Sequence, residues 1–119
     1  MSSADKLHAN LVARTCKHQD AVLVDLDGAK SHIIHMLMGI TGEAGELMDA
    51  AKKHVIYNKP LDIENVIEEL GDIEWYMQGL RAALHIDRED VLLYNIEKLR
   101  KRYPDKYTDA LAQARLDKA

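Results

Sequence analysis

Four acidic residues in the middle of the chain form two pairs with the same internal spacing. Glu46 follows Glu43 at the third position, and Asp72 follows Glu69 in the same way. Residues three positions apart lie on one face of an α-helix, so the carboxylates of each pair converge if their segments are helical. Carboxylate oxygens are the ligands that the hard cations Mg²⁺ and Mn²⁺ prefer. The spacing therefore predicts that all four side chains bind divalent metal.

Chance is the alternative explanation of these pairs, because the chain contains 20 acidic residues. A single pair of this kind usually lies on a solvated helix face, and Glu68, Glu74, Glu89 and Glu97 are expected on such faces. Two pairs on consecutive helices, each beside an apolar stripe, favour a metal site instead. Four carboxylates at a partly buried seam would repel one another strongly, and bound cations remove that repulsion.

Iron and zinc sites of the common kinds do not fit the residue pattern. Di-iron helical bundles use a Glu with a His three positions later, and no Glu of this chain has such a partner. The six histidines are scattered, without an H-E-x-x-H motif or the Cys and His spacing of structural zinc sites. An oxygen-only site is therefore expected, with Mg²⁺ as the cofactor and Mn²⁺ as a possible substitute.

Helices must position these side chains. Apolar residues recur at intervals of three and four, no long stretch alternates in the manner of a strand, and Pro60 and Pro104 fall between the periodic segments. Asp62 and Asp87 are predicted N-caps, Asp87 in a capping box with Asp90. We expect an all-α, four- to five-helix bundle of antiparallel helices, forming a single domain over residues 1–119. The expected helices cover about 5–24, about 31–55 with a start a few residues earlier as an alternative, 62–84, 87–103 and about 108–118.

Five of the six glycines lie inside these predicted helices, where each costs about 0.5–1 kcal/mol relative to Ala. Close packing of a neighbouring helix and close approach of a ligand explain such glycines equally well. They are Gly39, Gly42, Gly45, Gly71 and Gly79.

Side chains around the carboxylates fit an anionic nucleotide substrate. His35 shares a helix face with the first acidic pair and Tyr76 continues the face of the second, so both are candidates for contact with a base. Lys53 follows the first pair by about two turns and is a candidate for contact with phosphate. Asn95 and Lys98 share a face of the fourth helix and can bind phosphate or nucleotide through their amide and ammonium groups. For each of these residues an ordinary solvated or packing role is the alternative.

The bulk composition limits the function classes. The net charge is −4 and the pI is near 5.8, so the basic surface expected of a protein that binds polymeric nucleic acid is missing. The single cysteine, Cys16, excludes an internal disulfide and is expected to be a small buried side chain. No signal peptide and no apolar run of roughly 18 residues is seen, which favours a cytoplasmic location without membrane contact.

The motifs together resemble those of the MazG-like nucleotide pyrophosphohydrolases of the all-α NTP pyrophosphatase superfamily. The resemblance covers about residues 30–107 and lies in HMLMGITGEAGEL at 35–47, EELGD at 68–72, NIEKL at 95–99 and RYP at 102–104. It implies a helical bundle that forms homodimers and sometimes dimers of dimers, in the cytoplasm of a bacterium or of a phage-infected host cell. It also implies hydrolysis of (d)NTP between the α and β phosphates to (d)NMP and pyrophosphate, which would control nucleotide pools.

The resemblance also implies roles for residues at matching positions. Glu43, Glu46, Glu69 and Asp72 would be Mg²⁺ ligands, and Asn95 and Lys98 would contact the nucleotide. We expect Glu43 and Glu46 to be catalytic, with Glu46 as the carboxylate that orients or deprotonates the attacking water.

Two other functions stay open on the sequence. One is a phosphohydrolase of the same superfamily that acts on (d)NDP or dUTP, or on phosphoribosyl-ATP. The other is a non-catalytic helical binding module. The preferred base is also open, with dGTP, dUTP and damaged nucleotides as candidates.

Overall fold

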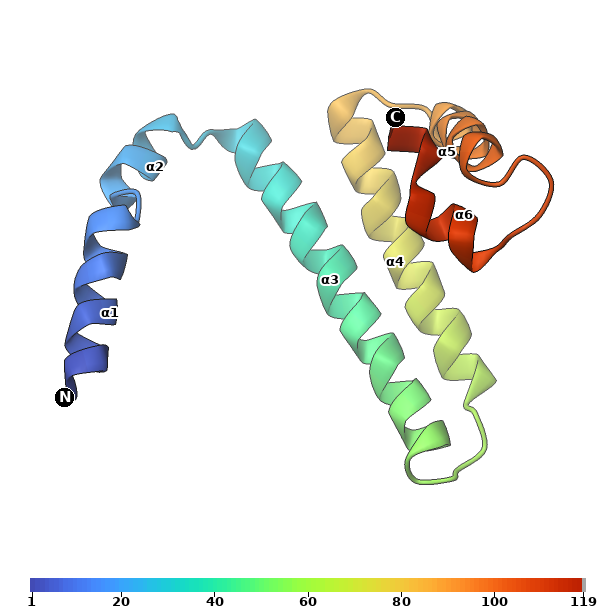
Figure 1. Cartoon of the computed structure of the whole chain (residues 1–119), viewed down its shortest axis with the longest axis horizontal. Helices are drawn as coiled ribbons and strands as arrows, with labels where there is room; N and C mark the ends of the chain where they lie inside the picture. Colours follow the sequence, from blue (N-terminus) through green and yellow to red (C-terminus); the bar gives the residue numbers. More distant parts are fainter. Residues whose placement is uncertain (119) are drawn as a thin grey trace. The chain divides into compact units, whose positions relative to one another are not determined.

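A computed structural model of the protein describes residues 1–118. Within these residues the chain forms six α-helices and one short 3-10 helix, and no strand (Figure 1). The prediction of an all-α fold is therefore confirmed. The chain divides into two compact units, Met1–Ser31 and His32–Ala119, which are described separately. The prediction of a single domain over residues 1–119 stays a prediction.

The first unit contains two helices where one was predicted, so the prediction of a continuous helix over 5–24 is wrong. Helix α1 covers Ser3–Thr15 and helix α2 covers Gln19–Asp25. The Thr15 hydroxyl donates to the Leu11 carbonyl at 2.7 Å, and the imidazole of His18 caps α2 by accepting the Asp20 N–H at 3.2 Å. Such local side-chain bonds compete with continuation of a helix. Cys16 lies at this break and is exposed, contrary to the expected burial.

The helix that carries the first acidic pair, α3, covers Gly28–Val55. It begins at the earlier of the two expected starts, because the Asp27 carboxylate accepts the Lys30 N–H at 2.9 Å in its first turn. It ends at Val55, and three residues later Asn58 adopts a left-handed conformation with φ 52°, two residues before Pro60. The chain reverses there and enters the helix that carries the second pair.

Helix α4 covers Ile63–Leu84 and begins at the predicted N-cap. The Asp62 carboxylate accepts the N–H of Asn65 at 3.1 Å, which confirms that prediction. Figure 1 shows α3 and α4 lying side by side and antiparallel, joined by one turn.

Two of the helix glycines allow α3 and α4 to approach closely. A Cβ added at Gly39 would overlap the ring of Tyr76, and one added at Gly79 would overlap the sulfur of Met36, which is buried. At Gly42, Gly45 and Gly71 an added Cβ would meet no atom within 4 Å. Close packing therefore accounts for two of the five glycines but not for the other three.

Helix α5 covers Arg88–Arg102 and is followed by α6, Asp109–Ala114, and by η1, Leu116–Lys118. Asp87 stands at the predicted N-cap position of α5 but makes no side-chain cap bond, so the predicted capping box is absent. The last predicted helix, 108–118, is interrupted at Arg115, whose φ is 51°.

An ion pair holds the end of the chain to α5. Arg102 donates to both carboxylate oxygens of Asp117 at 3.0 and 3.2 Å. The guanidinium of Arg102 is the main reason why the pKa of Asp117 lies far below its ordinary value, and the pair raises the pKa of Arg102 in turn. None of the described helices combines the length and the apolar character that a membrane span requires.

Candidate functional site

The antiparallel pair of α3 and α4 brings three of the four predicted metal ligands together. Glu43, Glu69 and Asp72 each place one carboxylate oxygen within 4.8 Å of the other two. Glu69 is buried, with 7% of its surface exposed, whereas Glu43 is half-buried and Asp72 is exposed. The cluster therefore has a closed side within the helix pair and an open side toward solvent.

The cluster is electrostatically unfavourable without a bound cation. The neighbouring carboxylate of Glu43, followed by burial and by the charge of Glu46, raises the pKa of Glu69 to about 7. One oxygen of Glu43 and one of Glu69 are buried without a hydrogen-bond partner. Buried polar atoms are normally satisfied, so two orphan carboxylate oxygens indicate a missing partner. This all-oxygen set fits a hard divalent cation such as Mg²⁺.

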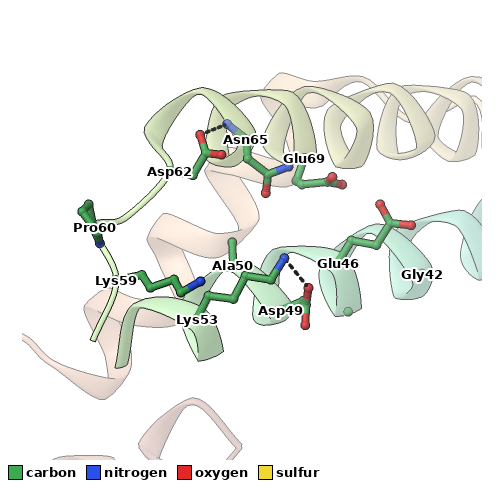
Figure 2. A pocket seen from close by; sticks show the side chains of 11 residues that line it. Gly42, Glu46, Asp49, Ala50, Lys53, Lys59, Pro60, Asp62, Asn65 and Glu69 are labelled. Atoms are coloured by element: carbon green, nitrogen blue, oxygen red, sulfur yellow. Dashed lines mark hydrogen bonds and ion pairs between the residues drawn. The ribbon is translucent and has the colours of Figure 1, made fainter. Parts of the chain in front are cut away.

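Glu46 lies next to this cluster. It is close enough to Glu69 to raise the pKa of that carboxyl, yet none of its oxygens belongs to the group of three. Figure 2 shows Glu46 of α3 and Glu69 of α4 extending into the space between the two helices. Because Glu46 lies beside the cluster and faces open space, its carboxylate is suited to contact a water molecule or a phosphate.

A pocket of about 710 Å³ opens beside the carboxylates, a volume typical of small-ligand sites. Glu46 and Glu69 line one end of it, and Lys53 and Lys59 line the other. The turn between α3 and α4 closes the lysine end, as Figure 2 shows. The pocket thus combines acidic groups that suit cations with basic groups that suit anions. The helical hairpin of α3 and α4 supplies both kinds of group.

The two candidates for contact with a base also lie together. The rings of His35 and Tyr76 are 6.2 Å apart and inclined at 65°, and the Tyr76 ring also meets that of Trp75 edge to face at 5.0 Å. The Tyr76 ring lies against Gly39. The space that a glycine leaves on α3 is therefore filled by the protein's own aromatic ring.

The candidates on α5 do not line this pocket. Lys98 lines a separate pocket of about 180 Å³ beside Asp117, and Asn95 is exposed on the same helix. Their contact with nucleotide stays a prediction, as do the roles of His35, Lys53 and Tyr76. The structure brings Lys59 and Asn65 into the carboxylate pocket, and neither was predicted from the residue pattern. The two chain segments that flank the turn of a helical hairpin lie opposite each other. The predicted turn at Pro60 was therefore the feature from which the positions of Lys59 and Asn65 could have been inferred.

Comparisons with known proteins identify the family to which this chain is similar. The family model of the MazG nucleotide pyrophosphohydrolase domain matches residues 32–107, a range that contains all four predicted metal ligands. The "Gene 37 protein" of Mycobacterium phage L5 is 33% identical over an alignment of 73 residues, and the match covers 57% of this chain and 63% of that protein. The chain thus spans less than two thirds of the length of this relative. No solved structure gave a significant match.

Proposed function

The chain belongs to the MazG nucleotide pyrophosphohydrolase family, and we propose on this basis that it is a Mg²⁺-dependent enzyme that hydrolyses (d)NTP to (d)NMP and pyrophosphate. The observation that carries the proposal is the cluster of Glu43, Glu69 and Asp72, with its two unsatisfied carboxylate oxygens. An enzyme of this kind would control nucleotide pools.

In this proposal the cluster and Glu46 hold Mg²⁺, for which Mn²⁺ can substitute. When bound there, the ions would neutralise charge on the phosphates and would lower the pKa of a water molecule. Glu46 orients the attacking water and accepts its proton. The water oxygen forms a bond to the α phosphorus, and the bond from that phosphorus to the α–β bridging oxygen breaks. Pyrophosphate leaves with the electron pair of that bond.

The nucleoside is proposed to lie on the far side of the carboxylates from the lysines. His35 and Tyr76 are there, and aromatic rings offer flat faces for stacking on a base. A panel of dNTPs assayed with Tyr76→Leu tests whether this ring selects the base.

The partner of the chain is proposed to be a second copy of itself, in a homodimer or a dimer of dimers. Large apolar side chains on α3 and α4 are more than half exposed, among them Met38, Met48, Ile67 and Trp75. An apolar depression of about 440 Å³ lined by Ile34, Leu37 and Met38 lies on α3. Exposed apolar side chains grouped in this way support the proposal of an interface. Sedimentation of the purified protein measures the oligomeric state directly.

The decisive experiment is product analysis with a panel of canonical and modified nucleotides in Mg²⁺ or Mn²⁺. Release of pyrophosphate and monophosphate is expected, whereas release of monophosphate and phosphate would indicate action on diphosphates. Glu46→Gln should lower kcat by roughly 10²–10⁴-fold, as loss of a general base usually does. An unchanged rate in this variant would show that the assigned site is wrong. Absence of hydrolysis, with no rise of Tm in Mg²⁺, would indicate a non-catalytic binding module.

A further inference from the structure

We propose that Lys59, in the turn between α3 and α4, binds the terminal phosphates of the substrate together with Lys53. The triphosphate then runs from the carboxylates toward this turn, and Lys59 favours triphosphates over diphosphates. The identity of the substrate rests on the proposed function, whereas the roles of the two lysines are inferred from the geometry of the pocket.

Both ammonium groups face the same space as the carboxylates. Lys53 and Lys59 line the 710 Å³ pocket whose other end is formed by Glu46 and Glu69. Figure 2 shows the side chains of Lys53 and Lys59 extending toward that acidic end. Glu46 and Lys53 are seven residues apart on α3, which corresponds to about 10 Å along the helix axis. This separation suits a triphosphate whose α phosphate lies at the carboxylates.

The backbone fixes the position of Lys59. Its N–H donates to the Lys53 carbonyl at 3.2 Å, and its own carbonyl lies 2.8 Å from Nδ1 of His54. Asn58 supplies the left-handed residue that reverses the chain. Pro60, which follows, restricts Lys59 to extended backbone conformations. Lys59 is therefore carried by an anchored turn, so less freedom is lost when it binds a ligand.

The charges around the two lysines differ. The ammonium of Lys53 pairs with Asp49 at 3.4 Å, whereas Lys59 forms no ion pair among residues 1–118. Asp62 also lines the pocket, but its carboxylate is engaged as the cap of α4. Lys59 is thus the ammonium that remains available for a phosphate, and a charge-assisted bond of this type is strong.

Phosphate binding can be measured without hydrolysis. We expect calorimetry with Mg²⁺ and inorganic tripolyphosphate to show about tenfold weaker binding to Lys59→Gln than to the unchanged protein. Pyrophosphate should be affected less, and Lys59→Arg should restore most of the affinity. The matched control is Lys52→Gln, because the Lys52 ammonium lies over the Tyr57 ring at 5.8 Å and does not line the pocket. This control should bind tripolyphosphate normally.

The outcomes separate this inference from the proposed function. If Lys59→Gln binds tripolyphosphate as tightly as the unchanged protein, or if the unchanged protein does not bind it, the role of Lys59 is refuted. Hydrolysis of dNTP by the unchanged protein would still support the proposed function in that case. If Lys59→Gln weakens tripolyphosphate binding in a protein that hydrolyses no dNTP, the phosphate site stands and the proposed function fails. Equal Tm values for the three lysine variants exclude misfolding as the cause.

Discussion

Replacing Gly39 by Ala would place a methyl group where the Tyr76 ring already lies. Three ring atoms, Cγ, Cδ1 and Cε1, would overlap the new Cβ, so the ring or the helix must move. Overpacking of this kind costs about 1–3 kcal/mol, and the higher helix propensity of Ala returns about 0.5–1 kcal/mol. The net loss is therefore up to about 2.5 kcal/mol. Since 1 kcal/mol corresponds to about 4 °C for a chain of this size, we expect Tm to fall by up to roughly 10 °C.

Two neighbouring glycines provide matched controls for this change. A Cβ at Gly42 or Gly45 meets no atom within 4 Å, so Ala at either position should raise the stability by about 0.5–1 kcal/mol through helix propensity alone. Thermal unfolding followed by circular dichroism measures all three variants under the same conditions.

A second test asks whether the Tyr76 ring causes the loss of stability in Gly39→Ala. In a Tyr76→Leu background, Gly39→Ala should lose most of its penalty, which would give a coupling of about 1 kcal/mol or more in a double-mutant cycle. If Gly39→Ala is as stable as Gly42→Ala, or if its penalty persists without the ring, the assigned contact between α3 and α4 is wrong.

Three further predictions concern charges. Removal of divalent metal by a chelator should lower Tm, and Glu69→Gln should abolish this dependence, which thermal scans with and without Mg²⁺ will detect. The pKa of Glu69 is raised to about 7 from its ordinary value of 4.5, so the folded metal-free protein holds a proton that the unfolded chain has released. The contribution of protonated Glu69 to the free energy of unfolding is present below about pH 4.5 and is lost as the pH rises through 7. Chemical unfolding measured from about pH 4.5 to 8 should show this loss for the unchanged protein but not for Glu69→Gln. The pKa of Asp117 is lowered instead, so the Arg102–Asp117 pair stabilises the fold above the ordinary Asp value and is lost in acid. Asp117→Asn should therefore speed hydrogen exchange in Leu116–Lys118 at neutral pH and leave Mg²⁺ binding unchanged; normal exchange there would argue against the pair.

The local features of the chain follow from short-range rules. The cap at Asp62 and the stop before Pro60 were predicted because a capping oxygen and a proline act on adjacent backbone groups. Two breaks were missed, near Cys16 and at Arg115, because each depends on a backbone conformation that several residue types adopt. No single residue there forces a helix to end.

The sequence by itself determined which carboxylates share a helix face, since a spacing of three residues suffices for that. Only the tertiary structure decided which of them meet across the helix pair, with Glu69 buried, Glu43 and Asp72 beside it, and Glu46 just outside. The same packing placed Tyr76 against Gly39 and brought Lys59 into the pocket. The helical period defines a direction around one helix, whereas the offset between two helices depends on how their side chains fit together. The offset between α3 and α4 therefore brought carboxylates of both acidic pairs together, beside a pocket whose other end is lined by lysines.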